Sequence, residues 1–183
     1  MDRSQTLARR SIILVITLFL VLGVLSGAGQ EEQGLHEFWT LDMTGEEVTE
    51  ELFAPYRLTM INVWATYCTP CLHEMPDLAE LHEEYRDNGV NIVGIVNDIN
   101  FSGEEAFQRS IATANYIIQE TGAHYTHLIP SEDLYNLRLK DVQVVPETFF
   151  VDSKGTIVGE TIYGARDKAA WKTIIDSTMQ LVE

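Results

Sequence analysis

The sequence contains few cysteines and few basic residues, and both shortages narrow what the protein can be. Only two cysteines, Cys68 and Cys71, occur among 183 residues, so a four-cysteine zinc site and a framework of several disulfides are both excluded. Lysine and arginine total 12 against 28 aspartates and glutamates, which gives a formal net charge of −16. Because so acidic a surface repels nucleic acid, we expect no nucleic-acid partner.

A long uncharged apolar run is confined to the N-terminus. Arginines precede residues 11–29, a stretch that carries no charge. A basic flank before such a run is typical of an export signal or a membrane anchor, and roughly 17–25 apolar residues span a bilayer. A small-x-small pair, Ser26 and Ala28, would also allow cleavage by a signal peptidase. An uncleaved anchor and a cleaved signal therefore both stay open.

The basic flank also predicts where the rest of the chain lies. Because positive flanks stay on the cytoplasmic side, we expect the protein in the cell membrane as a single-pass protein with its domain outside, or secreted or periplasmic after cleavage. The predicted parts are a signal segment at 1–29, a linker at 30–36 and one domain at 37–183. The N-terminal arginines and Asp2 together contribute a net charge of +2. Without them, the exported part has a formal net charge of −18. Outside the cytoplasm, disulfides persist.

Hydrophobic periodicity predicts a layered α/β domain. Strand-like pieces on either side of Thr44-Gly45 predict an N-terminal hairpin, and mostly apolar runs at 58–65 and 90–96 predict buried strands. Apolar residues at three- and four-residue spacing predict the helices, and the D-S-K-G turn predicts a late hairpin. Helices are expected at 68–88, 103–122, 131–139 and 167–181, and the late hairpin strands at 148–152 and 156–164. Alternating strands and helices place helices on both faces of a mixed sheet.

The two cysteines stand at the junction of a predicted strand and a predicted helix. Cys68 would lie at the helix N-terminus, where unpaired N–H groups and the helix dipole stabilise a thiolate. Pro70 suits the first helical turn, because its missing N–H is not needed there. A structural staple is disfavoured, since closing so short a loop removes little unfolded-state entropy. The pattern predicts a dithiol/disulfide switch in which Cys68 attacks and Cys71 resolves.

Two other uses of the cysteines remain open. A metal-binding or copper-delivery module could combine Cys68 and Cys71 with a histidine such as His73, although copper modules usually space their cysteines by three residues. A thiol peroxidase would need a P-x-x-x-T-x-x-C loop, and Ala65 stands at the threonine position. For the dithiol switch itself we expect no cofactor and no metal.

Three stretches carry a resemblance to a known family: "FWTLDMTGEEVT", "INVWATYCTPCLHEMP" and "VVPETFFVDSKGTIV". Together they resemble the extracytoplasmic thioredoxin-like reductases of the TlpA/ResA type, over residues 36–182. The resemblance implies a thioredoxin-like α/β fold with an N-terminal β-hairpin and a central insertion within 100–131. It also implies a thiol-disulfide oxidoreductase that reduces protein disulfides and is recharged by a membrane thiol-electron carrier of the CcdA type. Apocytochrome c and an exported methionine sulfoxide reductase are the expected clients, while the direction of exchange stays open.

The resemblance assigns roles at the redox-active disulfide and beside it. Cys68 resembles the exposed nucleophile and Cys71 the buried partner. Pro146 matches the family's cis-proline, which together with Val145 offers backbone to an extended substrate. The residues themselves support Pro146 only as a proline at the start of a strand.

Glu74 matches a glutamate of the family's C-x-x-C-x-x-E-x-P pattern. It follows Cys71 by three residues and therefore lies on roughly the same helical face. A partly buried carboxyl group there would have a raised pKa and could exchange protons with the Cys71 thiol. The simpler alternative is a solvent-facing glutamate. Ordinary thioredoxins carry a buried aspartate where this chain has Asn62. If a carboxylate serves the buried thiol in this chain, Glu74 is therefore the better candidate.

Four further residues are expected to contact the substrate. Trp64 and Tyr67 flank the site as the family's aromatics do, although Trp64 fits a core position equally well. Thr69 and Pro70 stand between the two cysteines.

Overall fold

The structure is a computed structural model that describes residues 33–182. The predicted signal segment at 1–29 and the first residues of the predicted linker lie outside the described residues. Within 33–182, no helix is both long enough and apolar enough to span a bilayer.

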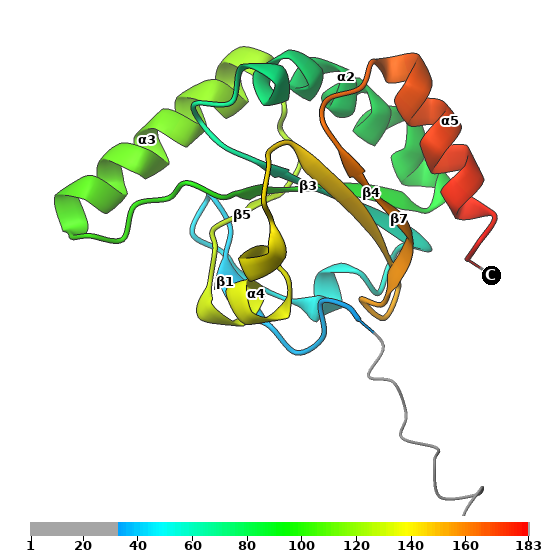
Figure 1. Ribbon diagram of the computed structural model, residues 1–183, viewed down its shortest axis with the longest axis horizontal. Helices are drawn as coiled ribbons and strands as arrows, with labels where there is room; N and C mark the ends of the chain where they lie inside the picture. Colours follow the sequence, from blue (N-terminus) through cyan, green and yellow to red (C-terminus); the bar gives the residue numbers. More distant parts are fainter. Residues whose placement is uncertain (1–32, 183) are drawn as a thin grey trace, which may run out of the picture. The chain divides into compact units, whose positions relative to one another are not determined.

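A five-stranded mixed sheet forms the centre of this part of the chain (Figure 1). Its strands are β3 (Leu58–Trp64), β4 (Val90–Val96), β5 (His127–Leu128), β6 (Glu147–Asp152) and β7 (Ile157–Tyr163). They lie in the order β5-β4-β3-β6-β7. The β3–β4 and β4–β5 pairs are parallel, and the β3–β6 and β6–β7 pairs are antiparallel. The predicted mixed sheet is therefore confirmed.

The two central strands are buried on both faces. Every residue of β3 and of β4 is buried, as their mostly apolar sequences predict. Because side chains alternate along a strand, Met60 and Trp64 join one hydrophobic cluster, whereas Ile61 and Val63 join the cluster on the opposite face. Asn62 shares its face with Met60 and Trp64, and this places a polar side chain inside the first cluster.

Helices cover both faces of the sheet. Figure 1 shows α2 (Thr69–Tyr85), α3 (Glu104–Thr121) and α5 (Lys168–Met179) on one face, and α4 (Glu132–Leu137) on the other. Hydrogen bonds from backbone N–H groups to the side chains of Ser131 and Asp167 cap the starts of α4 and α5. Gly122 ends α3 in the left-handed conformation, with a φ of 68°. The segment in which we expect the insertion, 100–131, forms α3 and β5.

The predicted N-terminal hairpin is confirmed, and it forms a sheet of its own. Strands β1 (Trp39–Leu41) and β2 (Glu47–Thr49) pair antiparallel around a turn that contains Gly45. The hairpin docks beside β5, since Met43 N–H donates to the carbonyl of His127 at 2.8 Å. The N–H of Ile129 in turn donates to the carbonyl of Leu41 at 2.8 Å.

Three predicted helices end earlier than expected, and one of them, expected at 167–181, ends at Met179. The helix expected at 131–139 ends at Leu137, because Arg138 leaves the helical conformation with a φ of −151°, and a 3-10 turn η3 (Leu139–Asp141) follows. The helix expected to reach residue 88 ends at Tyr85 and continues as the 3-10 turn η2 (Arg86–Asn88). One more 3-10 turn, η1 (Glu50–Leu52), follows the hairpin.

A buried histidine packs against the middle of β4. His127 is 3% exposed, its Nδ1 accepts from Trp64 Nε1 at 3.1 Å, and its Nε2 lies 2.9 Å from the carbonyl of Ala123. Burial lowers the pKa of His127 to about 4, so the ring is neutral near pH 7 and can accept at Nδ1. Gly94 leaves room for the ring, because a Cβ there would overlap Nδ1.

This packing predicts that substitutions at positions 94 and 127 have strongly coupled effects on the free energy of unfolding. We expect Gly94→Ala to lower the free energy of unfolding by about 1–3 kcal/mol, since the added methyl group overpacks a closed core. In a His127→Ala background the same substitution should lower it much less, because the imidazole is gone. Urea unfolding of the two single variants and the double variant measures this coupling. Purely additive effects would contradict the packing argument.

Candidate active site

Cys68 and Cys71 form a disulfide at the N-terminus of α2, with their Cα atoms 5.3 Å apart. Cys68 is the N-cap residue, and its Sγ accepts a hydrogen bond from the N–H of Cys71 at 3.2 Å. Cys68 is 6% exposed, whereas Cys71 is fully buried. A client can therefore reach only the sulfur of Cys68 without rearrangement of the fold. In the reduced state, the same N–H and the helix dipole stabilise a thiolate at Cys68.

The surface around Cys68 is formed by its neighbours in sequence. Tyr67 is 76% exposed, and both Thr69 and Pro70 are exposed. Trp64 differs from them: it is fully buried, and its indole N–H donates to His127. Its side chain therefore supports the loop from inside the core and presents no surface to a docked protein.

The loop between β3 and Cys68 is tied to the loop that follows β4. The backbone N–H of Thr66 donates to both carboxylate oxygens of Asp98, at 3.0 and 3.1 Å, and its hydroxyl donates to the same group. The N–H of Asn97 also donates to the carbonyl of Trp64 at 2.8 Å. The loop that presents the disulfide is thus held by hydrogen bonds on both sides of Ala65.

Pro146 lies at the same edge of the sheet. The Val145–Pro146 peptide bond is cis, which confirms the expectation drawn from the family resemblance. Val63 pairs with Glu147 across β3 and β6, so Pro146 comes beside the end of β3, where the cysteine loop begins. Val145 is half-buried and packs against the cluster that contains both cysteines.

Glu74 is inside the protein, and the alternative of a solvent-facing glutamate is wrong. Its side chain is 2% exposed. Oε1 accepts from Asn62 Nδ2 at 2.9 Å, and Oε2 accepts from the N–H of Arg166 at 3.1 Å and from Trp171 Nε1 at 3.3 Å. Asn62 also donates to the hydroxyl of Thr148 at 3.1 Å.

Burial raises the pKa of Glu74 above its ordinary value, and the hydrogen bonds from Arg166, Asn62 and Trp171 oppose this rise. The carboxyl group is therefore held on the same helix as Cys71, three residues further on, with its pKa shifted toward the range of thiols. Such a group can give or take a proton inside the core.

Two hydrogen-bond donors to Glu74 could not be predicted from the sequence. No pattern in the sequence predicts that Trp171, in the last helix, or Arg166, just before it, contacts Glu74. Both contacts join residues more than 90 positions apart in the chain, with separations of 97 and 92. Asn62 could have pointed to a buried polar partner, because an amide side chain within an apolar strand requires one.

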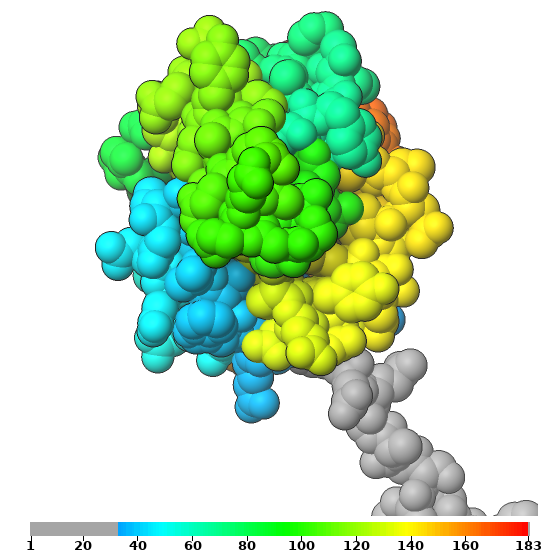
Figure 2. Space-filling model, turned by 90° about the vertical axis from the view of Figure 1, so that its left-hand side faces the viewer, coloured from blue at the N-terminus to red at the C-terminus, as the bar shows by residue number. Residues whose placement is uncertain are grey.

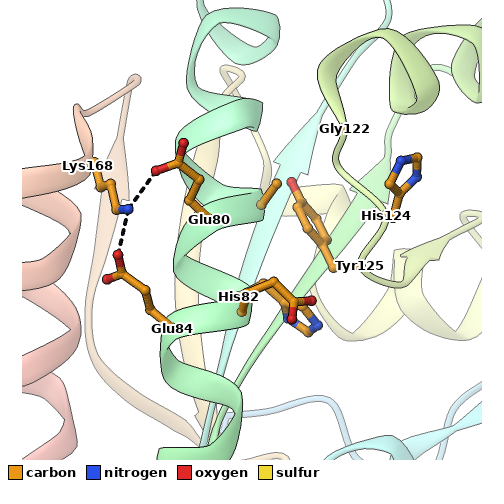
Figure 3. A pocket seen from close by; sticks show the side chains of 9 residues that line it. Glu80, His82, Glu84, Gly122, His124, Tyr125 and Lys168 are labelled. Carbon is orange, nitrogen blue, oxygen red and sulfur yellow. Dashed lines mark hydrogen bonds and ion pairs between the residues drawn. The ribbon is translucent and has the colours of Figure 1, made fainter.

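A hollow of about 510 Å³ lies beside α2, away from the disulfide, and is lined by imidazole, phenol and carboxylate groups. Figure 3 shows Glu80 and Glu84 extending toward Lys168, on the side of α2 opposite to His82 and Tyr125. Glu80 and Glu84 therefore lie apart from His82, whereas Glu83, which also lines this hollow, acts on His82 by its charge. Across residues 33–182, no group of three or more His, Cys, Asp or Glu side chains is placed to hold a metal ion.

Comparison with known proteins agrees with this geometry. The profile of the AhpC/TSA family matches residues 33–159. The thiol-disulfide oxidoreductase ResA of Oceanobacillus iheyensis is 25% identical over 176 residues, covering 89% of this chain and 83% of the relative. The thioredoxin-like protein YneN of Bacillus subtilis is 28% identical over 131 residues, covering 70% of this chain and 69% of the relative.

Solved structures show the same fold. A thiol:disulfide interchange protein of the thioredoxin family from Chlorobium tepidum TLS superimposes with a TM-score of 0.67 at 18% identity, covering 83% of this chain and 99% of that one. StoA from Bacillus subtilis superimposes with a TM-score of 0.57 at 16% identity, covering 77% and 97%. The predicted thioredoxin-like fold is confirmed.

The raised pKa of Glu74 predicts how stability depends on pH. A carboxyl group with a higher pKa in the folded than in the unfolded chain adds stability while it is protonated in both states. This contribution is lost as the pH rises from the unfolded pKa, about 4.3, through the folded one. We therefore expect the stability of the wild type relative to Glu74→Gln to fall over that window and then level off. Urea unfolding between about pH 4 and pH 9 measures the difference.

A glutamine at position 74 can be accommodated in the core with a hydrogen-bond partner for its amide. Asn62 Oδ1 is buried without a hydrogen-bond partner, and rotation of the amide would let it accept from the new side chain. Glu83→Gln is the matched control, since that side chain is 65% exposed on the same helix. Its pH profile should follow the wild type. Parallel profiles for the wild type and Glu74→Gln would contradict a raised pKa at Glu74.

Proposed function

The chain belongs to the AhpC/TSA family, and on that premise we propose that Cys68 and Cys71 are the dithiol of an extracytoplasmic reductase of protein disulfides. The protein is a thiol-disulfide oxidoreductase of the ResA type within the thioredoxin-like fold. The observation that carries the proposed direction of attack is the unequal burial of one disulfide: Cys68 reaches the surface at a helix N-terminus, and Cys71 does not.

The proposed reaction moves two electrons and two protons. The Cys68 thiolate attacks one sulfur of the client disulfide, which forms a mixed disulfide and releases the first client thiolate. Cys71, as a thiolate, then attacks the sulfur of Cys68, which closes the Cys68–Cys71 disulfide and releases the second client thiolate. The client gains two thiols, and the reductase loses its two.

Glu74 serves the second step in this proposal. Cys71 is fully buried and must lose its proton before it can attack. A carboxyl group on the same helix can accept that proton, and burial, which raises the pKa of Glu74, makes its carboxylate a stronger base. On the return path, the same group gives the proton back when the disulfide is reduced again.

Substrate contact is proposed at the edge that presents Cys68. Tyr67, Thr69 and Pro70 supply exposed surface beside the sulfur. The Val145–Pro146 segment would offer its backbone to an extended client chain. The position of Pro146, beside the end of β3, supports this arrangement.

The proposed setting is the outer side of the cell membrane. Residues 1–29 would act as the signal or anchor, 30–36 as the linker and 37–183 as the exported domain, which the charge-free run at 11–29 supports. Recharging requires two electrons, and we assign it to a membrane thiol-electron carrier of the CcdA type. Clients would be apocytochrome c with its C-x-x-C-H site, or an exported methionine sulfoxide reductase.

Substitution of each cysteine separates the two roles. We expect Cys68→Ser to abolish exchange, because the remaining thiol is buried. Cys71→Ser should instead accumulate a mixed disulfide, since nothing resolves it. Non-reducing electrophoresis and mass spectrometry, after incubation with an oxidised C-x-x-C-H peptide, measure both outcomes. Failure of Cys71→Ser to form the adduct, combined with rapid turnover of hydrogen peroxide by the wild type, would favour a thiol peroxidase.

The midpoint potential of the pair tests the direction of exchange. Equilibration of the full-length chain with a dithiothreitol or glutathione redox buffer should give a value near or below about −250 mV, the thioredoxin end of the scale. A value near about −120 mV, where strong oxidants lie, would reverse the proposed direction and make the protein a disulfide donor.

A further inference from the structure

An apolar groove of about 510 Å³ lies between the first strand, the start of α3 and the start of α4. Three aromatic side chains along it are well exposed: Trp39 at 49%, Phe101 at 61% and Tyr135 at 56%. Phe107 packs against Phe101 with a ring separation of 5.7 Å, and Ile129 also lines the groove. Clusters of exposed aromatic residues are uncommon on surfaces that contact only water.

The groove and the disulfide lie at the same edge of the sheet. Strands β3, β4 and β5 are parallel, so their C-terminal ends meet there. Cys68 follows β3, Phe101 follows β4, and Ile129 follows β5. Bonds from Thr66 to Asp98 join the first two of these loops directly. In α/β proteins, ligands bind beyond the carboxyl ends of such strands.

One face of the molecule brings these segments together. In Figure 2 the blue β1, the green start of α3 and the yellow α4 meet on the visible face, with the blue-green α2 above them. The N–H of Trp39 donates to a carboxylate oxygen of Asp133 at 3.0 Å, which ties β1 to α4 beneath the groove. The groove is thus formed by three elements, two of which, β1 and α4, are joined by this hydrogen bond.

Carboxylates outnumber basic groups around the groove. Among residues 33–182, Glu132 is the one charged residue that lines the groove. Glu104 and Glu105 begin α3 at its rim, and the guanidinium of Arg109 is paired with Glu105. A positively charged partner segment is favoured at such a rim, because opposite charges attract during encounter and discriminate between partners.

We propose that this groove binds a bulky apolar side chain, next to a basic residue, in the client polypeptide whose disulfide reacts with Cys68. The inference rests on the proposed reductase function and adds a determinant of client choice to it. Aromatic side chains that line a pocket are the residues that most often dominate binding at protein interfaces. Because the groove and Cys68 lie at the same edge of the sheet, we expect one extended segment to reach both.

Synthetic peptides test this inference with the full-length protein in its dithiol form. Each peptide contains one C-x-x-C disulfide, and a spacer of four to ten residues, about 13–36 Å when extended, leads to either Phe-Arg or Ser-Glu. Single-turnover oxidation of Cys68 and Cys71 is followed by acid quench and thiol alkylation. For the optimal spacer, we expect the Phe-Arg peptide to react about tenfold faster than its Ser-Glu counterpart.

Paired variants identify the groove as the source of that preference. Phe101→Ser and Tyr135→Ser should each remove most of the tenfold difference, whereas Tyr116→Ser, at a position 64% exposed on α3 and outside the groove lining, should keep it. All three should reduce hydroxyethyl disulfide at the wild-type rate, because this small molecule does not reach the groove.

Several outcomes would overturn the inference. Equal rates for both peptides with the wild type, or a preference that survives both groove substitutions, would do so. A concentration-dependent dimer that Phe101→Ser dissolves would assign the groove to a second copy of the chain. If the wild type reduced hydroxyethyl disulfide but showed no peptide preference, the docking inference alone would fail. If it reduced no disulfide at all, the proposed function would fail with it.

Discussion

A carboxyl group enclosed in the core is the constraint on which the arrangement of the site depends. Glu74 of α2 accepts hydrogen bonds from β3, from the segment before α5 and from α5 itself. A buried polar group without partners destabilises a fold by about 1–3 kcal/mol, and a charged one by more. These three donors therefore hold α2 in one rotation against the sheet. That rotation turns Cys71 inward and leaves Cys68 at the open end of the helix.

The same constraint divides the site into an inner and an outer part. The inner part holds Glu74 and Cys71, which share a helix and a water-poor environment, and we assign proton transfer to it. The outer part holds Cys68 and the exposed Tyr67, where the loops from three parallel strands meet, and we assign client recognition to it. Thiol chemistry benefits from this division, because the attacking sulfur needs access whereas the resolving sulfur needs protection from other disulfides.

A second set of polar contacts holds the loop before Cys68 and does not involve the sulfurs or Glu74. The indole of Trp64 is bonded to the neutral ring of His127, and Tyr125 stacks on that ring at 4.5 Å. Asp98 holds Thr66 from the other side. The loop before Cys68 is therefore bound from the core and from the loop that follows β4.

The element order, the buried strands and the position of the cysteine pair at a helix start could be predicted from the sequence, because they depend on signals within a few residues of each other: apolar periodicity, caps, turns and the C-x-x-C spacing. Glu74 became a candidate through the resemblance to the TlpA/ResA-type reductases. Three features became visible only in the folded chain: Trp64 lies in the core, Trp171 and Arg166 donate to Glu74, and His127 accepts from Trp64. The last contact spans 63 positions, and those to Glu74 span 97 and 92. No local pattern encodes such pairs, because they form only when the sheet order and the helix rotation bring distant residues into contact.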